Sequence, residues 1–518
     1  MAFYKDHYDV IVIGGALAGM SCAMKLASEG KDVLILERHN VPGGLATSFV
    51  RNGVEMEATL HEMMSIGPEE KPLFIREYLD EMGVRINWLR VPEAYRLLSP
   101  ADDIDIIIHA GRRDDGTWVC ADEIDAKYPG TKAEVNRLLE TCKSVYESVL
   151  FLNENSASKL ELLLHHEPLA KTAGYSAREV LEKSFHLPED VVKILSAYWI
   201  YVGQPITTLP FTIYCFLMAD YLLGGSYVAR GFSHEMSVAM AERCVELGCQ
   251  FEYCQNVEKI LVRNNHVYGV RTSRGDEIHC DYIACAPYPN EVYARMIEPQ
   301  SEVPVMARKY AAAMPMGVTT FSVVLQLDRR PEELGIHDYS VFSSNIKFDT
   351  DVFWKQGKEN LGNWSNLTTI CLNYANPAGV PEGKTSLSIT FLPLSDPFFD
   401  VTADDYQDMK RRVAKQMIEQ VSEYLGVDLL EHIEEIEIES PMTVSRFSGM
   451  YLGGIYGYQH SMDNSVVARL EDVEKEQWIK GLVACASHQL VGDGMACNIN
   501  NGKIAAKMIS AGLKEEGK

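Results

Sequence analysis

The order of segments in the first 44 residues most constrains how this chain can fold. Two apolar runs flank a glycine-rich turn and a proline-free stretch, and an acidic residue follows the second run. The segments are Tyr8 to Ile13, Gly14-Gly15-Ala16-Leu17-Ala18-Gly19, Met20 to Glu29, Val33 to Leu36, and Glu37. Strand, glycine turn, helix, strand and acid is the order of a dinucleotide-binding βαβ unit. The alternative is an ordinary βαβ unit that binds no nucleotide.

Each part of this unit has a physical role. Gly14 allows the tight turn, Gly19 allows close packing of helix on strand, and the helix N-terminus offers N–H groups and a positive dipole end to a pyrophosphate. Glu37, 18 residues beyond Gly19, can accept hydrogen bonds from ribose hydroxyls. Ala16 occupies the position of the middle glycine, and we expect its methyl group to be tolerated with a shifted phosphate.

The length and net charge of the chain exclude several classes of protein. A chain of 518 residues is too long for one core and indicates two domains. The net charge of −25 argues against nucleic acid and against electrostatic docking on anionic lipid. No apolar signal region precedes the first strand, and the twelve cysteines include no Cys-x-x-Cys pair. We therefore expect a cytoplasmic protein with reduced thiols and no metal site.

A second glycine pair changes the expected cofactor from NAD to FAD. Glu37 is followed by Arg38 and, after a short interval, by Gly43 and Gly44. In flavoproteins with the two-dinucleotide-fold motif, an acid, an Arg and then Gly-Gly bring the loop close to the pyrophosphate and ribityl chain. A surface turn is the alternative.

The C-terminal segment supports FAD as well. Residues 481–487 read as a buried strand, the loop to Gly494 contains Gly492 and Asp493, and a helix is expected from Met495 onward. Such a helix directs its N-terminal dipole at the isoalloxazine and stabilises negative charge there. Strands are also expected near Val257, at 267–270 and at 278–286, so the nucleotide domain is assembled from three separate segments.

Taken together, these motifs resemble the phytoene desaturase and retinol saturase family of FAD oxidoreductases, and more distantly the monoamine oxidase-type flavoproteins. The segments 225–232, 318–336 and 445–457 also match the family. The resemblance implies an α/β fold: a Rossmann-like FAD domain with a parallel sheet (1–100, 225–300 and 440–518) and an interleaved mixed α+β substrate domain (101–224 and 301–439). By this resemblance the cofactor-binding residues are Gly14, Gly15, Ala16, Gly19, Glu37, Arg38, Gly43, Gly44, Val257, Gly492, Asp493 and Met495.

The chain departs from the family at Thr59, where a glycine is usual. There is also no second glycine-triplet βαβ unit for NAD(P)H in the sequence. Electrons must then pass to or from a quinone, a carrier, oxygen or another substrate.

The expected catalytic residues handle protons, because flavin supplies hydride chemistry. His61 and Glu62 follow the loop that ends near the flavin, and His488 lies in the C-terminal loop; each could be a general acid or base. A structural role is the alternative for each. The aromatic-rich stretch 198–221 could form the walls of a substrate site or the core of the second domain.

The sequence thus predicts an FAD oxidoreductase that adds or removes hydrogen at a carbon–carbon bond of a hydrophobic unsaturated molecule such as a polyene, isoprenoid or lipid. The alternative is a redox-neutral FAD-dependent isomerase or hydratase of a lipid. A non-enzymatic FAD-stabilised scaffold is a third option. Expected partners are the hydrophobic substrate and an unidentified electron donor or acceptor, with peripheral membrane contact as an option and no nucleic acid. Substrate, direction and oligomeric state stay open.

Overall fold

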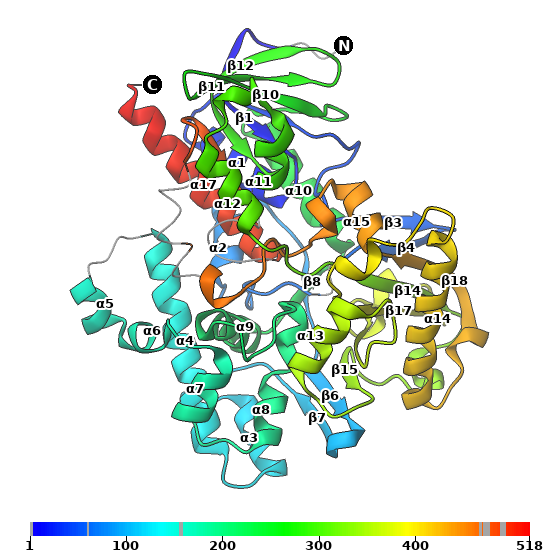
Figure 1. Cartoon of the computed structure of the whole chain (residues 1–518). Coiled ribbons are helices and arrows are strands. Elements are labelled where there is room, and N and C mark those ends of the chain that lie inside the picture. Colours follow the sequence, from blue (N-terminus) through cyan, green and yellow to red (C-terminus); the bar gives the residue numbers. More distant parts are fainter. Residues whose placement is uncertain are drawn as a thin grey trace.

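The described part of the computed structural model contains two large β-sheets, two two-stranded sheets and a helical region (Figure 1). It describes residues 4–59, 62–154, 159–465, 469, 477–486 and 494–517. His61, His488, Gly492 and Asp493 therefore lie outside the described residues. In Figure 1 the first sheet is at the top with both termini, the second sheet is at the lower right and the helices α3–α9 are at the lower left.

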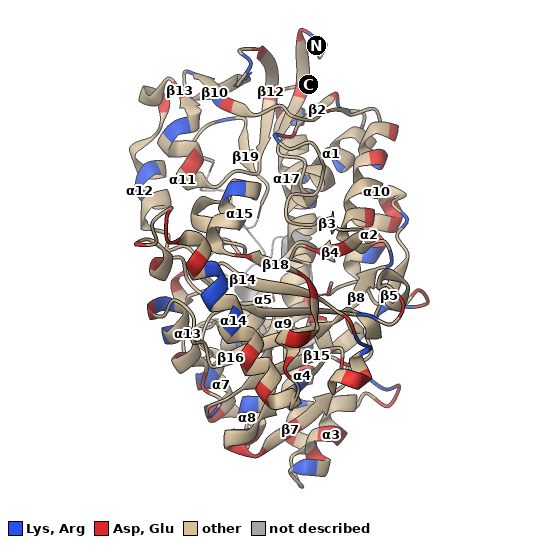
Figure 2. Cartoon of the chain, turned by 90° about the vertical axis from the view of Figure 1, so that its right-hand side faces the viewer, with Lys and Arg blue, Asp and Glu red and all other residues tan. Residues whose placement is uncertain are grey.

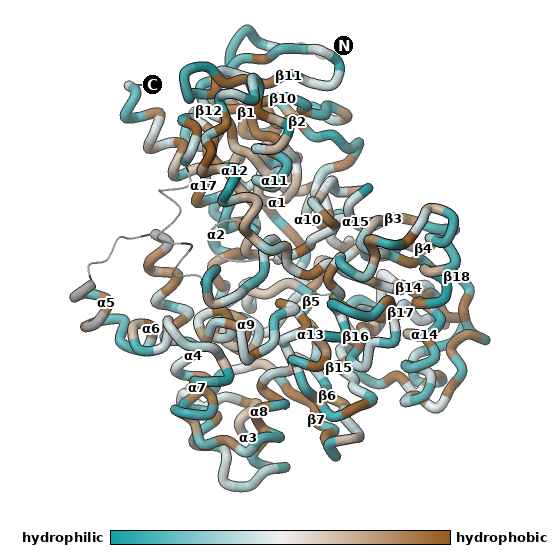
Figure 3. The backbone as a smooth tube through the Cα atoms, in the orientation of Figure 1, coloured by the Kyte–Doolittle hydropathy of each residue, from teal (hydrophilic) through white to brown (hydrophobic). Residues whose placement is uncertain are grey.

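The first sheet is built from distant parts of the chain. Its strands follow the order β13-β10-β11-β12-β1-β2-β9, and β19 pairs with β12. Their bounds are β1 His7–Ile13, β2 Val33–Leu36, β9 Gln250–Glu252, β10 Val257–Arg263, β11 His266–Thr272, β12 Glu277–Cys285, β13 Ile297–Glu298 and β19 Leu482–Ala484. Strands β12, β1, β2 and β9 are mutually parallel, whereas β10, β11 and β12 form an antiparallel meander. The central strands are buried and apolar, as expected for a sheet covered on both faces, and they appear brown in Figure 3.

Two helices from opposite ends of the chain pack against each other beside this sheet. They are α1 (Leu17–Ser28) and α17 (Met495–Glu515). A Cβ on Gly502 of α17 would collide with the carbonyl oxygen of Ala18, so glycine is what permits the close approach. The Ser21 hydroxyl donates to the Ile499 carbonyl oxygen at 2.6 Å. The helix that follows the glycine turn is thus fixed by the C-terminal helix. A third helix, α10 (Phe232–Glu246), also contacts α1.

The second sheet has seven strands in the order β18-β14-β17-β16-β15-β6-β7. Their bounds are β6 Tyr95–Ser99, β7 Ile104–Ile108, β14 Phe321–Leu327, β15 Ser340–Ser344, β16 Asn366–Cys371, β17 Thr385–Phe391 and β18 Ile433–Glu439. Side chains of β14 alternate, so that Phe321, Val323 and Leu325 join the large core while Ser322 faces the other side. Helices α13 (Thr350–Glu359) and α14 (Tyr406–Leu425) accompany this sheet.

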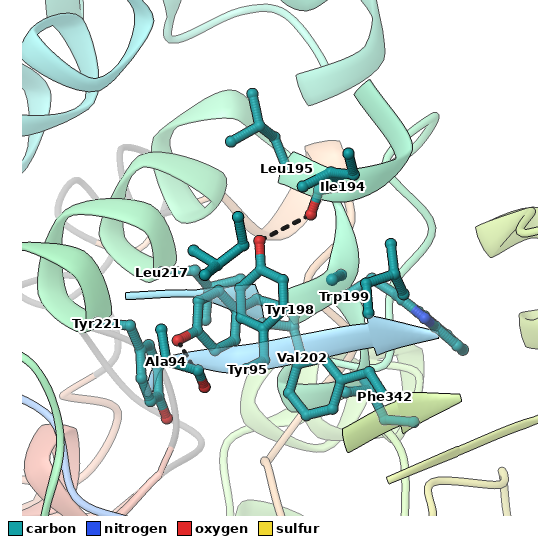
Figure 4. Packing of buried hydrophobic residues seen from close by; sticks show 14 of the residues in the cluster. Ala94, Tyr95, Ile194, Leu195, Tyr198, Trp199, Val202, Leu217, Tyr221 and Phe342 are labelled. Carbon is teal, nitrogen blue, oxygen red and sulfur yellow. Dashed lines mark hydrogen bonds between the residues drawn. The ribbon is translucent and has the colours of Figure 1, made fainter. Parts of the chain in front are cut away.

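The helical region shares one hydrophobic core with the second sheet. It contains α3 Val119–Lys127, α4 Lys132–Glu154, α5 Lys159–His165, α6 Glu167–Thr172, α7 Ala177–Ser184, α8 Glu189–Leu195 and α9 Phe211–Gly224. Helix α9 is buried along nearly its whole length. Figure 4 shows part of this core, in which the Tyr95 hydroxyl donates to the Ile194 carbonyl oxygen at 2.8 Å.

Short elements join the two sheets. They are α2 Phe74–Met82, α11 Pro289–Glu291, α12 Val305–Ala313, α15 Pro441–Ser448, the hairpin β3 Ser48–Arg51 with β4 Val54–Glu57, and the pair β5 Trp88–Arg90 with β8 Tyr227–Ala229. Arg51 donates to Glu437 at 2.6 Å, which ties the hairpin to the acidic edge strand β18. In Figure 2 the basic segments are separated by tan and red ones. None of the described helices has the length and apolar character needed to cross a bilayer.

The fold is the α/β class that the sequence predicts. The predicted strand Val33 to Leu36 matches β2, and the run from Tyr8 lies within β1. Strand pairing places β6 and β7 together in the second sheet. The numerical domain boundaries stay a prediction.

Candidate active site

One cavity of about 550 Å³ connects the glycine turn with the aromatic region. Its walls include Gly14, Ala16 and Glu37 at one end and Tyr201 and Tyr221 at the other. We call the first part the cradle, lined by residues 13, 14, 16–18, 36–39, 41, 43–46, 255–259, 447–450 and 494–498. We call the second part the aromatic lobe, lined by Glu62, Met63, Met64, Tyr201, Val202, Ile213, Leu217, Tyr221, Ile455 and Tyr456.

The glycine turn of the cradle has glycine at positions 14, 15 and 19, and Ala16 occupies the middle position. Gly14 has φ +105°, a conformation that L side chains rarely adopt. A Cβ on Gly15 would lie 2.6 Å from the Phe251 ring, and one on Gly19 would collide with the Gly14 carbonyl oxygen. A side chain at any of these three positions would therefore strain the turn or collide with its neighbours.

Two helix N-termini face the cavity. Ala16 is the N-cap of α1 and Gly494 is the N-cap of α17, and neither provides a side-chain hydrogen bond to the first turn. Ala16, Leu17 and Ala18 line the cavity at one helix, and Gly494 and Met495 line it at the other. The uncapped N–H groups and the helix dipoles suit anionic groups at both points. This arrangement fits a pyrophosphate at α1 and a flavin ring at α17.

The Glu37 carboxylate supports the turn as well as facing the cavity. It accepts hydrogen bonds from the Gly15 and His39 backbone N–H groups, each at 2.7 Å. The side chain is buried, and a carboxylate has acceptor sites for further donors. Its predicted bonds to ribose hydroxyls stay a prediction, and the structure adds a role in holding the loop.

The second glycine pair packs directly on the first. The Gly43 N–H donates to the Gly15 carbonyl oxygen at 2.9 Å. Gly43 has φ +104°, and a Cβ there would collide with Ser237. A Cβ on Gly44 would lie 3.0 Å from the Ala16 Cβ. The two loops predicted to contact one cofactor are thus brought together.

Arg38 lines the cradle and also links it to the C-terminal part of the chain. Its guanidinium donates to the carbonyl oxygens of Arg446 and Phe447 at the end of α15. The Phe447 ring packs at 4.5 Å from the His39 ring. A role of Arg38 toward the cofactor stays a prediction.

The far end of the cradle contains polar atoms that have no partner among the described residues. They are His39 Nδ1 and Gln255 Oε1, both buried. Both residues line the cavity beside Val257. Buried polar atoms are nearly always satisfied, so a ligand with donors and acceptors, such as an adenine, fits here. Sequence reasoning selected Val257 and the segment 445–457 that contains Phe447, and it missed His39 and Gln255, because no local motif marks those two residues.

The aromatic stretch 198–221 divides between wall and core. Helix α9 presents Ile213, Leu217 and Tyr221, spaced by four residues, to the cavity. Tyr198 stacks on Tyr221 at 4.6 Å and belongs to the buried cluster of Figure 4. Residues of the same stretch are therefore divided between the cavity lining and the core, and the role of the lining residues toward a substrate stays a prediction.

Glu62 is the one predicted proton-handling residue that the structure describes. Its side chain is 5% exposed and lines the aromatic lobe, and neither carboxyl oxygen has a hydrogen-bond partner among the described residues. Burial raises the pKa of Glu62 to about 8, since desolvation disfavours the charged form. The Tyr201 and Ser226 hydroxyls act against this rise and Glu93 adds to it. Near neutral pH the group is thus mainly an uncharged acid. The roles of His61, His488, Gly492 and Asp493 stay predictions.

His460 is a further cavity-lining residue that the sequence did not single out. It is buried, and its Nδ1 lies 3.3 Å from the Arg469 guanidinium. No sequence motif surrounds His460, so the sequence gave no reason to select it.

This fold and site define a class: an α/β flavoprotein with a dinucleotide cradle joined to a substrate cavity. The family model described as flavin containing amine oxidoreductase matches residues 17–467, and the chain belongs to this family. FAD is its cofactor, and the protein is an FAD-dependent oxidoreductase.

Curated relatives are similar to this chain over most of their own length. A prolycopene isomerase of Daucus carota is 22% identical, covering 86% of this chain and 71% of the relative. An all-trans-retinol 13,14-reductase of Danio rerio is 23% identical, covering 88% and 78%. A 4,4'-diapolycopene oxygenase of Methylomonas is 23% identical, covering 88% of each chain. The expected likeness to the phytoene desaturase and retinol saturase group is confirmed.

Solved structures share the fold. Putrescine oxidase bound to putrescine superposes with a TM-score of 0.63 at 13% identity, covering 98% of each chain. An oxidoreductase from Methanosarcina mazei gives 0.61 at 14% identity, covering 97% of this chain and all of the other.

Proposed function

We propose that the protein adds or removes hydrogen at a carbon–carbon bond of a hydrophobic, unsaturated substrate held in the aromatic lobe. The observation that carries this proposal is the continuity of the lobe with the FAD cradle in one cavity. The names of the relatives, which include a retinol reductase and enzymes named for prolycopene and diapolycopene, support a polyene substrate.

In this proposal the chain positions the substrate and manages the proton. The FAD, when bound, accepts or supplies hydride. Tyr221, Leu217 and Ile213 form an apolar wall that fixes a long chain and excludes water. Glu62, uncharged near neutral pH, could supply the proton that accompanies hydride movement at a double bond.

An anaerobic single turnover tests this proposal. Photoreduced enzyme is mixed with a panel of polyenes, unsaturated fatty acids and enones while flavin absorbance and product mass are followed. Stoichiometric reoxidation with a product heavier by two hydrogens supports a saturase, and bleaching of oxidised enzyme with loss of two hydrogens supports a desaturase. Turnover without any change of product mass, or with the gain of one water, and without an external electron acceptor contradicts both.

The second candidate is a redox-neutral isomerase or hydratase. The prolycopene isomerase relatives favour isomerisation, because they resemble this chain as closely as the reductase does. The same panel separates the candidates by product mass.

We also propose an electron partner other than a nicotinamide bound by its own domain. The described strands and helices contain one glycine-rich βαβ turn followed by an acid, at Gly14 to Glu37. Positioning is worth about 7–11 kcal/mol of barrier, so NADH or NADPH alone should reduce the flavin slowly. Rapid stopped-flow reduction by micromolar NADH would contradict this.

For the cellular location we propose the cytoplasm, with contact at a membrane surface as the source of an apolar substrate. All twelve cysteines are free, and eleven of them are buried, which suits a reducing compartment. Fractionation of cells that produce the chain with its own termini tests the location.

A further inference from the structure

One face of the second sheet is polar although protein covers it. Strands β14, β16 and β17 send alternate side chains to two faces, of which one joins the large core. The other face carries Ser322, Val324, Gln326, Thr368, Ile370, Ser386, Ser388 and Thr390. Most of these side chains are buried. A covered sheet face is normally apolar, so the polar groups of this face need hydrogen-bond partners.

A small pocket of about 30 Å³ lies between this face and the segment 57–59 at the end of β4, which is close to β14 in Figure 1. Its polar walls are Glu57, Thr59, Ser322, Ser386 and Ser388. One water molecule needs at least about 10–15 Å³, so the pocket has room for about two. The pocket therefore has both the size and the polar walls that buried water requires.

Polar atoms near the pocket lack partners. Gln326 lies directly across from Ser386, and neither its amide oxygen nor its amide nitrogen has a hydrogen-bond partner in the described part of the chain. The same holds for the Thr368 hydroxyl, which lies on the same face as the pocket residue Ile370. Buried polar groups are nearly always satisfied, and ordered water does this where protein atoms do not.

Glu439 continues this polar face toward the surface. It is buried, lies directly opposite Ser322 in the pairing of β18 with β14, and has one carboxyl oxygen without a partner among the described residues. The Cβ atoms of directly opposite residues are about 4.5–5.5 Å apart, so Glu439 lies beside the pocket wall. Glu437, two residues earlier on the same face, has a side chain that is 30% exposed. Strand β18 therefore connects Glu439 with solvent.

Glu57 is the acid at the other end. It lines the pocket and accepts hydrogen bonds from the Ser233 backbone N–H and hydroxyl. Desolvation raises the pKa of Glu57 and of Glu439 to about 8, so each carboxyl can take up and release a proton near neutral pH. We call the residues of the pocket, together with Gln326, Thr368 and Glu439, the polar layer.

Thr59 joins the polar layer to the main cavity, the one shared by the cradle and the aromatic lobe. It lines both the pocket and the main cavity. Its hydroxyl donates to the Leu45 carbonyl oxygen at 3.1 Å, which is longer than the usual O–H···O distance of about 2.7–2.8 Å. A hydroxyl both donates and accepts, so Thr59 can exchange this long bond for a transfer between the two spaces. Glycine, which is usual in the family at this position, would supply no hydroxyl.

We propose that the polar layer delivers protons from solvent to the main cavity, entering at Glu439 and leaving at Glu57 and Thr59. FAD takes up protons when it is reduced, and hydride movement at carbon is accompanied by proton transfer. FAD and a substrate that occupy the main cavity exclude water from it, so a separate route keeps the proton supply open.

Each step of this route moves one proton. Glu57 gives its proton through pocket water to the Thr59 oxygen while the original Thr59 proton passes into the main cavity. Glu57 is then reprotonated from Glu439 through water beside Ser322, and Glu439 is reprotonated from solvent. Only O–H bonds form and break, and no electron is transferred.

The test measures proton uptake by the FAD-loaded protein without any substrate. A light flash reduces the flavin through a soluble photoexcited electron donor, flavin absorbance records the reduction, and a pH-indicator dye records the protons. We expect Thr59→Val to slow proton uptake about 10- to 100-fold with normal FAD content. Thr59→Ser keeps the hydroxyl and should restore the rate.

Variants at the two acids test the rest of the route. Glu57→Gln and Glu439→Gln should each slow proton uptake, and the double variant should be little slower than the slower single one, because both acids lie on one path. Glu439 lies outside the main cavity, so its variant reports on the route even if changes near Thr59 weaken FAD binding. The matched control is Thr319→Val, because Thr319 is buried with an unpartnered hydroxyl and lines neither the pocket nor the main cavity.

A high-resolution crystal structure of the wild type tests the water directly. We expect ordered water in the pocket, within hydrogen-bond distance of Glu57 and of the serine hydroxyls. A dry pocket overturns the inference.

The kinetic outcomes are equally decisive. Wild-type proton uptake in Thr59→Val, Glu57→Gln and Glu439→Gln overturns the inference, since protons then reach the flavin through the main cavity. Slow uptake in Thr59→Ser as well as in Thr59→Val overturns the assigned role of the hydroxyl. The measurement contains no substrate, so its failure leaves the proposed reaction standing, and failure of the substrate panel leaves the proton route standing.

Discussion

The cradle and the aromatic lobe share one cavity but are built in different ways. The cradle is made mainly of backbone, with Gly14, Gly43 and Gly44 in its walls and two helix N-termini that face the cavity. The lobe is made of side chains from segments that lie far apart in the sequence. A site formed by backbone atoms is encoded by short sequence motifs. A lobe lined by side chains from distant segments is formed only by the whole fold. The cradle should therefore be sensitive to single atoms and the lobe to shape and polarity.

The largest effect is expected at Gly43. Gly43→Ala places a Cβ against Ser237 and forces a side chain into φ +104°, so FAD binding should fall by more than about 3 kcal/mol. FAD content after purification and FAD titration measure this. Gly30→Ala is the matched control, because Gly30 also has positive φ but open space around it. Equal FAD affinity in both variants would show that the contact between the two loops does not matter.

A smaller effect is expected at Glu37. Glu37→Ala leaves the Gly15 and His39 N–H groups without their acceptor and removes acceptors from the cavity. FAD affinity should fall by about 1–3 kcal/mol, measured by calorimetry. Unchanged affinity would remove Glu37 from both of its assigned roles.

A larger side chain in the aromatic lobe should weaken substrate binding without affecting FAD binding in the cradle. Leu217→Trp narrows the cavity and should raise the substrate KM about 10-fold, since overpacking costs about 1–3 kcal/mol. FAD content should stay normal. Leu222→Met on the same helix is the control, because Leu222 is buried outside the cavity lining. Loss of FAD from Leu217→Trp would contradict the division between the two regions.

The smallest effect concerns pH. Because burial raises the pKa of Glu62 from 4.5 to about 8, the folded state holds a proton that the unfolded state releases between these values. Glu62 therefore costs no folding stability below about pH 4.5 and costs progressively more as pH rises to about 8. Glu62→Gln should thus raise the thermal midpoint relative to the wild type at pH 8.5 by the equivalent of about 1 kcal/mol, and much less at pH 5. A difference that is constant with pH would indicate that Glu62 is ionised throughout.

Several elements were predictable because their signals are local. The turn from Gly14 to Gly19, the acid Glu37 and the Gly43-Gly44 pair lie within 31 consecutive residues. Of these, the residues that line the cavity are Gly14, Ala16, Leu17, Ala18, Glu37, Gly43 and Gly44. The α/β fold, FAD and the oxidoreductase class follow from this short region and from the strand and helix at the C-terminus. Glu62 could be selected because it follows closely in sequence.

Other features depended on distant pairing. Gln255 and His39 both line the cradle because β2 pairs with β9. The sequence does not show that Gln255 Oε1 and His39 Nδ1 are buried without a hydrogen-bond partner among the described residues. The division of residues 198–221 into wall and core was decided by the packing of α9, since apolar residues occur around this whole helix and its sequence shows no preferred side.

The sequence by itself determined the nucleotide fold, the cofactor and the direction of the helix dipoles, because these rest on glycine conformations and on the order of adjacent segments. Only the tertiary structure decided which aromatic residues line the cavity and that Glu62 and Tyr201 share its wall. The physical reason is burial: a carboxyl group is an ordinary charge in the sequence, and it becomes a neutral hydrogen-bond donor only where distant segments close around it and remove water.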